Sequence, residues 1–178
     1  MLIQHIMDSL AIVPALTSYP ISPMLDVGSG GGLPGVVLAI SKPDWQVTLN
    51  DAAQKKTAFL THLKTVLPLP NVQILTGRVE SLSSSEFFFN ALVSRAFSNL
   101  SELALLTRHL ATPGASIWAM KGVFPEAEIS EFKAKALDRM HIAYVVKLNV
   151  PFLNAERHLV QLQASQRLQR ASEPMKAV

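Results

Sequence analysis

The stretch Met24–Ile40, MLDVGSGGGLPGVVLAI, holds five of the eight glycines in this chain: Gly28, Gly30, Gly31, Gly32 and Gly35. Glycine loses more backbone entropy on folding than any other residue, so such a cluster indicates a backbone that turns tightly or lets a ligand approach closely. The apolar residues at 24–27 predict a short strand, and residues 33–42 predict a helix with Pro34 in its first turn, where the missing N–H is harmless.

Apolar runs that are typical of strands alternate with amphipathic helical patterns along the rest of the chain. The patterns predict strands at 24–27, 45–50, 71–76, 87–94, 115–122, 142–150 and 157–164, and helices at 2–13, 33–42, 52–67, 100–110 and 126–140. In the helix at 52–67 we expect one apolar side made of Ala58, Phe59, Leu63 and Leu67. The alternation predicts an α/β fold with a mostly parallel sheet and helices on both faces. The last two strands have no long helix between them, so we expect an antiparallel edge strand.

Length and composition favour one domain, at residues 1–165, followed by a polar tail at 166–178 that we expect to be disordered. The chain has no cysteine, which excludes disulfides, thiolate metal sites and cysteine nucleophiles. No apolar run reaches the roughly 18 residues that span a bilayer, so we expect a cytoplasmic protein without membrane contact. The net charge of +3 permits a polyanionic partner but equally fits an ordinary surface.

Two ligand classes compete for a strand, glycine loop and helix. Gly30-x-Gly32-x-x-Gly35 matches the dinucleotide pattern literally, but that pattern begins where the strand ends, and Gly28 already stands there. Leu33 then occupies the place of the third glycine. A P-loop is excluded because no Gly-Lys-Ser/Thr follows.

The second class is S-adenosylmethionine (AdoMet). Asp26-x-Gly28-x-Gly30-x-Gly32 resembles the first motif of Rossmann-like methyltransferases. Asp26 can hold the loop or face the ammonium group of the ligand. Asp51 ends the second predicted strand 19 residues after Gly32, where its carboxylate can bind ribose hydroxyls or cap the next helix.

Several segments together resemble one methyltransferase family. They are HIMDSL at 5–10, LDVGSGGGLPGVVLAI at 25–40, GRVESL at 77–82, VSRAFSNL at 93–100, AMKG at 119–122 and ERHLV at 156–160. Their order and spacing are similar to those of the RsmG (GidB) family of bacterial 16S ribosomal RNA guanine-N7 methyltransferases. The resemblance implies a Rossmann-like class I fold, AdoMet as methyl donor with S-adenosyl-L-homocysteine as product, and 16S rRNA of the small ribosomal subunit, not DNA, as partner.

The resemblance also implies roles for individual residues on the cofactor side. Gly28 and Leu33 match AdoMet contacts, Val79 and Glu80 match positions that frame the adenine, and Arg95 matches another position of the AdoMet site. Arg95 can bond the ligand, or form an ion pair with a carboxylate such as Glu80. Together with Asp26, Gly30 and Asp51, these are the predicted cofactor-binding residues.

The predicted RNA-binding residues lie later in the chain. Lys121, Arg157 and His158 match basic residues of the family near the open face. Phe97 is a candidate platform on which a splayed-out base stacks, or else a core phenylalanine. His5 and Asp8 share a face of the first helix, and we expect them to link this helix to the sheet.

The residues themselves narrow the target atom. Carbon-5 methylation of pyrimidines commonly needs a cysteine, and NALVSRAF replaces the Asp/Asn-Pro-Pro-aromatic run that often marks methylation of exocyclic amines. Guanine N7 has a free lone pair and loses no proton, so no general base is required. The five histidines have no metal-ligand spacing, and we expect neither a catalytic side chain nor a metal.

Two differences from the family leave alternatives open. Family members usually carry a helical segment before HIMDSL, which here follows Met1 almost directly. We expect slower methylation of small subunits and self-association through a bared apolar face. Asn90 stands where an acid is common, and we expect a local effect. The alternatives are a non-catalytic AdoMet-binding remnant, or a methyltransferase that acts on another substrate.

Overall fold

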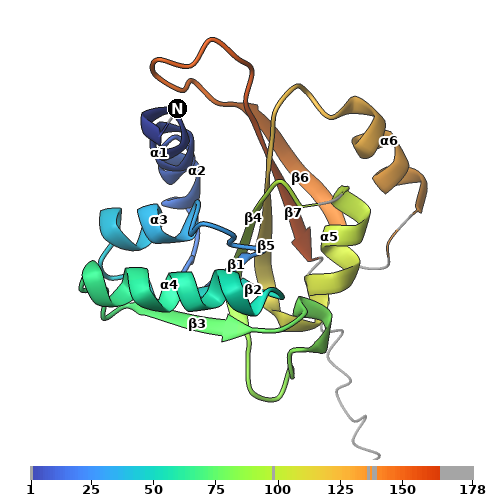
Figure 1. Ribbon diagram of the computed structural model, residues 1–178. Helices are drawn as coiled ribbons and strands as arrows, with labels where there is room; N and C mark the ends of the chain where they lie inside the picture. Colours follow the sequence, from blue (N-terminus) through green and yellow to red (C-terminus); the bar gives the residue numbers. More distant parts are fainter. Residues whose placement is uncertain (1, 98, 136, 138–139, 165–178) are drawn as a thin grey trace, which may run out of the picture.

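A single seven-stranded sheet forms the centre of the molecule (Figure 1). The computed structural model describes residues 2–97, 99–135, 137 and 140–164. Its strands are β1 (Met24–Val27), β2 (Val47–Asp51), β3 (Val72–Thr76), β4 (Phe89–Arg95), β5 (Ala111–Lys121), β6 (Met140–Lys147) and β7 (His158–Ala164), in the order β3-β2-β1-β4-β5-β7-β6. The strands from β3 to β5 are parallel, and β7 is antiparallel to both β5 and β6. The predicted mixed sheet is confirmed, whereas the tail predicted at 166–178 lies outside the described residues.

The helices alternate with the parallel strands as predicted. They are α1 (Leu2–Leu10), α2 (Val13–Leu16), α3 (Gly35–Ser41), α4 (Gln54–Val66), η1 (Val79–Ser81), α5 (Leu100–Thr107), η2 (Arg108–Leu110) and α6 (Glu126–Lys135). The single helix predicted at 2–13 is wrong, because the chain forms two helices and places Pro14 at the start of the second. Pro14 has no N–H with which to continue the hydrogen-bond ladder of α1. Similarly, Pro34 caps α3 instead of lying inside its first turn.

Alternate residues of β1, β4, β5, β6 and β7 fill two apolar clusters, one on each face of the sheet, and β2 and β3 add residues to the first of them. Met24 belongs to the cluster that Leu16, Leu38 and Leu60 of α2, α3 and α4 complete. Its neighbour Leu25 belongs to the opposite cluster, together with residues of α5, η2 and α6. Helices therefore cover both faces of the sheet. In sheets of this kind, ligands bind at the carboxyl ends of the parallel strands.

The apolar side predicted for α4 is right for Leu63, which packs against the core, and wrong for Ala58, Phe59 and Leu67, which are exposed. Leu60 and Thr57 are buried instead. The Thr57 hydroxyl accepts a 2.7 Å hydrogen bond from the Thr76 hydroxyl at the end of β3. The side of α4 that faces the sheet therefore combines apolar packing with a polar contact.

Hydrogen bonds between side chains and backbone join the strands at both ends of the sheet. At the carboxyl ends, the Ser94 hydroxyl donates to the carbonyl of Val27, and the Asn50 amide donates to the carbonyls of Leu75 and Gly77. At the opposite end, the Asn90 amide donates to Ser22 and accepts from the Thr112 hydroxyl. An ionised carboxylate at position 90 has no proton to donate, so the asparagine suits its local surroundings.

In the part of the chain that the structure describes, no helix has the length and apolar character to cross a membrane.

Candidate active site

The glycine loop between β1 and α3 turns through backbone conformations that L side chains rarely adopt. Gly28, Gly30 and Gly32 have φ values of +69°, +56° and +90°. The loop is closed by the Gly32 N–H, which donates to the Ser29 carbonyl at 2.7 Å, and it is tied to β2 by the Ser29 N–H, which donates to the Asn50 carbonyl at 2.9 Å. The glycines therefore make a tight turn that keeps its backbone near the edge of the sheet.

Asp26 holds this loop from beneath. Its side chain is fully buried, and one carboxylate oxygen accepts a 2.8 Å hydrogen bond from the N–H of Gly35. A Cβ at position 35 would lie 2.6 Å from that oxygen and 2.3 Å from the Leu49 side chain, so only glycine fits. The other oxygen, Oδ1, has no hydrogen-bond partner among the described residues. Burial raises the pKa of Asp26 to about 7, against the opposing effect of the Gly35 N–H.

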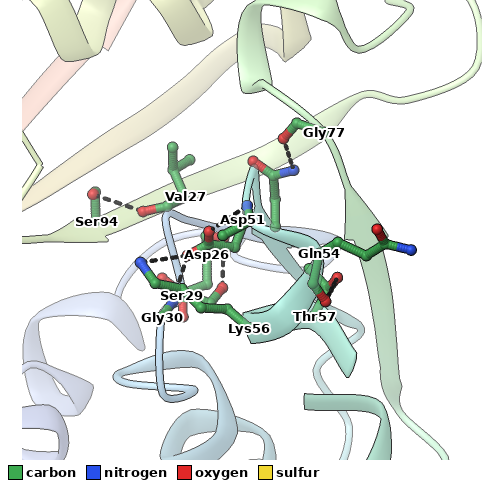
Figure 2. A network of polar contacts seen from close by, with 12 residues as sticks. Asp26, Val27, Ser29, Gly30, Asp51, Gln54, Lys56, Thr57, Gly77 and Ser94 are labelled. Atoms are coloured by element: carbon green, nitrogen blue, oxygen red, sulfur yellow. Dashed lines mark hydrogen bonds and ion pairs between the residues drawn. The ribbon is translucent and has the colours of Figure 1, made fainter. Parts of the chain in front are cut away.

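Asp51 connects the loops that follow β1 and β2 (Figure 2). Its Oδ2 accepts a 3.0 Å hydrogen bond from the Gly30 N–H and lies 3.5 Å from the Lys56 ammonium, while its Oδ1 accepts from the Ala53 N–H at 2.9 Å. Ala53 itself is the N-cap of α4, and no side chain caps that helix. The two oxygens of a carboxylate offer about four acceptor positions, so Asp51 keeps room for a ligand hydroxyl.

The remaining predicted cofactor residues lie on both sides of these two acids. Leu33 follows the loop and is half-buried. Val79 is buried in η1, directly after β3, and Glu80 next to it is exposed. The Glu80 carboxylate lies 3.5 Å from the Arg78 guanidinium. The suggested ion pair between Arg95 and Glu80 is wrong, because Arg95 pairs with Asp8 instead.

A cavity of about 470 Å³ opens beside the glycine loop, where β4 and β5 end. Residues of four segments that are distant in the sequence line it, among them Asp8, Arg95, Phe97, Lys121, Gly122 and Arg157. Phe97 connects the cavity with the loop, since a Cβ at Gly28 would lie 3.6 Å from the Phe97 ring. The structure thus brings the two groups of predicted residues next to each other.

Asp8 lies at the centre of the charged wall of this cavity. It is buried, and its two oxygens lie 3.1 Å from Arg157 Nε and 3.8 Å from Arg95 Nη1. The Arg95 guanidinium also lies 3.5 Å from His5 Nδ1. The expectation that His5 and Asp8 link the first helix to the sheet agrees with these contacts. Their place in the cavity was missed, because no local pattern brings residue 8 to residue 157.

The other two RNA candidates differ in their surroundings. Lys121 forms a 2.8 Å ion pair with Glu128, whose carboxylate also accepts from the N–H of Leu100 at the start of α5. His158 is 6% exposed, and its Nδ1 lies 2.9 Å from the carbonyl of Gly122, a hydrogen bond that holds the turn after β5. Lys121 lines the cavity, whereas His158 supports it. The described residues contain no group of three or more side chains suited to a metal ion.

Sequence comparisons agree with the motifs. The family model described as GidB, rRNA small subunit methyltransferase G, matches residues 1–160. A ribosomal RNA small subunit methyltransferase G from Burkholderia cenocepacia is 53% identical over 165 residues, which are 91% of this chain and 71% of that protein. The protein of the same name from Burkholderia vietnamiensis has the same identity and coverage.

Structural comparisons show the fold. The glycopeptide N-methyltransferase MtfA superposes with a TM-score of 0.69 at 13% identity, over 88% of this chain and 89% of that one. TrmN from Thermus thermophilus superposes with a TM-score of 0.65 at 13% identity, over 88% of this chain and 48% of that one. The architecture is therefore that of class I AdoMet-dependent methyltransferases. Given the family match over residues 1–160 and the 53% identity, the chain belongs to the GidB family, the rRNA small subunit methyltransferases G.

Proposed function

We propose that this protein transfers the methyl group of AdoMet to N7 of a guanine in 16S rRNA of the small ribosomal subunit, in the cytoplasm. The observation that carries the proposal is the contact between two sites. The Gly28 backbone, part of the glycine loop that Asp51 holds, faces the Phe97 ring, and Phe97 also lines the cavity of about 470 Å³. Because the two sites meet at Phe97, a cofactor over the glycine loop and a base in the cavity would lie next to each other.

The residues present fit AdoMet. Asp51 is held by two backbone N–H groups in a position to accept hydrogen bonds from vicinal hydroxyls. Gly28 is exposed at the edge of the sheet, so a ligand can approach its backbone closely. Support for the cofactor also comes from MtfA complexed with S-adenosyl-L-homocysteine, which superposes with a TM-score of 0.67 at 12% identity, over 88% of this chain and 89% of that one.

When bound, AdoMet supplies an electrophilic methyl group. Guanine N7 loses no proton on methylation, so the protein needs to align and desolvate the base and does not need to deprotonate it. Phe97 offers a ring for stacking, and Arg95, Arg157 and Lys121 supply cations for the guanine carbonyl or for phosphate. Good alignment alone lowers a barrier by roughly 7–11 kcal/mol.

The experiment measures tritiated methyl transfer to small subunits that lack N7-methylguanine, followed by chain cleavage at N7-methylated guanine. We expect transfer to one guanine, and weaker cofactor binding by Asp51→Asn. The loss of a charge-assisted acceptor is worth about 1.5–3 kcal/mol, or roughly 10- to 150-fold in affinity for S-adenosylhomocysteine. Asp44→Asn, at an exposed carboxylate before β2, is the matched control. Cofactor binding without any transfer would instead favour the non-catalytic remnant.

A further inference from the structure

A second unusual backbone site lies on the loop that joins β6 to β7, at residues 148–157. Val150 and Leu153 form a turn in which the Leu153 N–H donates to the Val150 carbonyl at 3.2 Å. Pro151 occupies the second position of this turn, and Phe152 occupies the third with a φ of +63°. Proline followed by a positive φ is the arrangement of a type II turn, which prefers glycine or asparagine at the third position. A phenylalanine there is strained.

Packing does not explain this phenylalanine, because its side chain is 83% exposed. The loop is anchored at two points. Val150 is buried, and the Leu148 N–H donates to the Arg157 carbonyl at 2.8 Å, which closes the base of the loop. The loop therefore presents an aromatic ring to solvent beside an anchored residue. A strained backbone conformation whose side chain is not buried suggests that the residue has a function.

The position of the loop relates it to the cavity. Lys121 at the end of β5 and Lys147 at the end of β6 both pair with His158 at the start of β7. The loop thus projects from the edge at which β5 ends, near the start of α1 (Figure 1). Its last residue, Arg157, lines the cavity. Among the described residues other than glycine, only Ala96 also has a positive φ, and it lines the same cavity.

A neighbouring loop adds exposed apolar side chains. Val123 and Phe124 follow Gly122 after β5 and are 73% and 51% exposed. Phe124 also lies edge-on to the His158 ring, with centroids 5.5 Å apart. Phe152, Val123 and Phe124 therefore rise from adjacent strand ends around a cavity that carries two arginines and a lysine. Aromatic rings beside cations are the combination that binds unpaired nucleotides.

We propose that Phe152 forms a stacking platform for an unpaired RNA base adjacent to the methylated guanine, with Val123 and Phe124 as further exposed apolar side chains at the neighbouring strand end. This rests on the proposed function, since it extends the nucleotide-binding cavity outward along the same RNA strand. The exposed ring stacks on a base of any sequence, and Arg157 at the base of the loop lies within the path of the strand. Stacking of a base on an aromatic ring contributes roughly 5- to 150-fold in affinity.

The test compares two exposed phenylalanines, Phe152 and Phe88, which lie at opposite ends of the strands. Phe88 is 60% exposed and lines a cavity of about 250 Å³ at the amino ends of the parallel strands. We expect Phe152→Ala to raise KM for small subunits roughly tenfold with kcat nearly unchanged, and Phe88→Ala to leave both unchanged. Binding of S-adenosylhomocysteine should be the same in all variants. An unchanged KM for Phe152→Ala would overturn the proposal.

Two further substitutions separate stacking from stability. Phe152→Gly suits the positive φ, so its urea midpoint should equal or exceed that of the wild type while KM rises. Phe152→Trp keeps a stacking surface and should restore a KM near the wild-type value. If Phe152→Gly raised the KM only in proportion to a loss of folded protein, the role of Phe152 would be structural and the proposal wrong.

A binding measurement with a short single-stranded oligoribonucleotide identifies the partner. We expect Phe152→Ala to weaken this binding as it raises KM. An effect on small subunits with none on the oligonucleotide would mean that the ring contacts a ribosomal protein, which contradicts the proposal. Absence of transfer by the wild type would refute the proposed function instead, and the oligonucleotide measurement would still decide the role of Phe152.

Discussion

The proposed cofactor side and the proposed RNA side of this site, called below the cofactor side and the RNA side, are built in different ways. The cofactor side consists of backbone and two carboxylates, Asp26 and Asp51, that bind N–H groups within 21 residues of themselves. The RNA side consists of charged side chains whose partners are far apart in the sequence, as Asp8 and Arg157 are at a separation of 149 residues. The first depends on close packing under one loop, and the second on ion pairs between helix and sheet. The two sides should therefore fail separately when they are mutated.

The largest effect is expected on the cofactor side, for Gly35→Ala. The added Cβ would lie 2.3 Å from Leu49 and 2.6 Å from the Asp26 carboxylate, and both neighbours are buried. Overpacking at such a site lowers the free energy of unfolding by about 3 kcal/mol or more, and S-adenosylhomocysteine binding should be lost as the loop shifts. Urea denaturation and calorimetric titration measure both quantities.

Gly31→Ala is the matched control in the same loop. No atom lies within 4 Å of the added Cβ, and Gly31 does not have a positive φ. We expect its free energy of unfolding to change by less than about 1 kcal/mol. Equal destabilisation by the two substitutions would mean that the loop needs glycine for flexibility and not for the close contact between Asp26 and α3.

The next effect concerns the RNA side, where Asp8→Ala leaves two arginines without their carboxylate. The side chains of Arg95 and Arg157 are 24% and 28% exposed, between the surface and the interior. We expect a loss of about 2–3 kcal/mol in the free energy of unfolding, less than for a fully buried pair, together with a strong loss of methyl transfer. Binding of S-adenosylhomocysteine should weaken far less than transfer.

Glu131→Ala is the control, because it breaks an exposed ion pair with Lys135 within α6. Such pairs contribute about 0.3–0.5 kcal/mol. If Asp8→Ala abolished cofactor binding as completely as Gly35→Ala, the two sides of the site would form one cooperative unit and would not lose their functions separately.

The same difference decides how much could be predicted from the sequence. The glycine loop, Asp26 and Asp51 were recognisable because their partners lie in one strand-loop-helix unit and the strand beside it. The alternation of strands and helices also predicted a mostly parallel sheet with an antiparallel part, but not the order of its strands. The pairing of Arg95 with Asp8 in place of Glu80 could not be predicted, because the choice depends on where α1 packs against the sheet.

The failures within single elements have local physical causes. The buried side of α4 includes Thr57, which forms a hydrogen bond with Thr76, and a hydrophobic pattern gives no sign of such a contact. The positive φ of Phe152 could not be predicted from the sequence either. Pro151 indicates a turn, but it does not determine the conformation of the residue after it. Motifs therefore indicated a candidate site, while the assembly of its charged and aromatic wall required the structure.

A smaller effect, with a defined sign, is expected for Asp26→Asn on the cofactor side. Burial raises the pKa of Asp26 from 3.8 to about 7, so the folded protein binds a proton that the unfolded chain releases between these pH values. The contribution of Asp26 to stability is therefore fully present below pH 3.8 and is lost as the pH rises toward 7. Asparagine keeps an acceptor for the Gly35 N–H and has no such loss.

The measurement is the difference in unfolding free energy between wild type and Asp26→Asn across this pH range. We expect the free energy of unfolding of the wild type to fall relative to that of the variant as the pH rises from 3.8 to about 7, and not to fall further at higher pH. Asp44→Asn, at an exposed carboxylate, should run parallel to the wild type. A constant difference between wild type and Asp26→Asn would show that Asp26 is ionised in the folded protein throughout.

The smallest effect is expected on the RNA side, for the two histidines at the cavity. His5 is exposed beside Arg95, and His158 is buried with its Nδ1 against the Gly122 carbonyl. Neither has a proton to take if the methylated atom is guanine N7. We expect His5→Ala, and His158→Asn, which keeps a donor for Gly122, to lower kcat by less than about tenfold, or 1.4 kcal/mol. Loss of turnover in either variant, while S-adenosylhomocysteine still binds, would mean that the histidine takes a proton from the target atom. The proposed N7 chemistry would then be wrong, although the cofactor side of the site would stand.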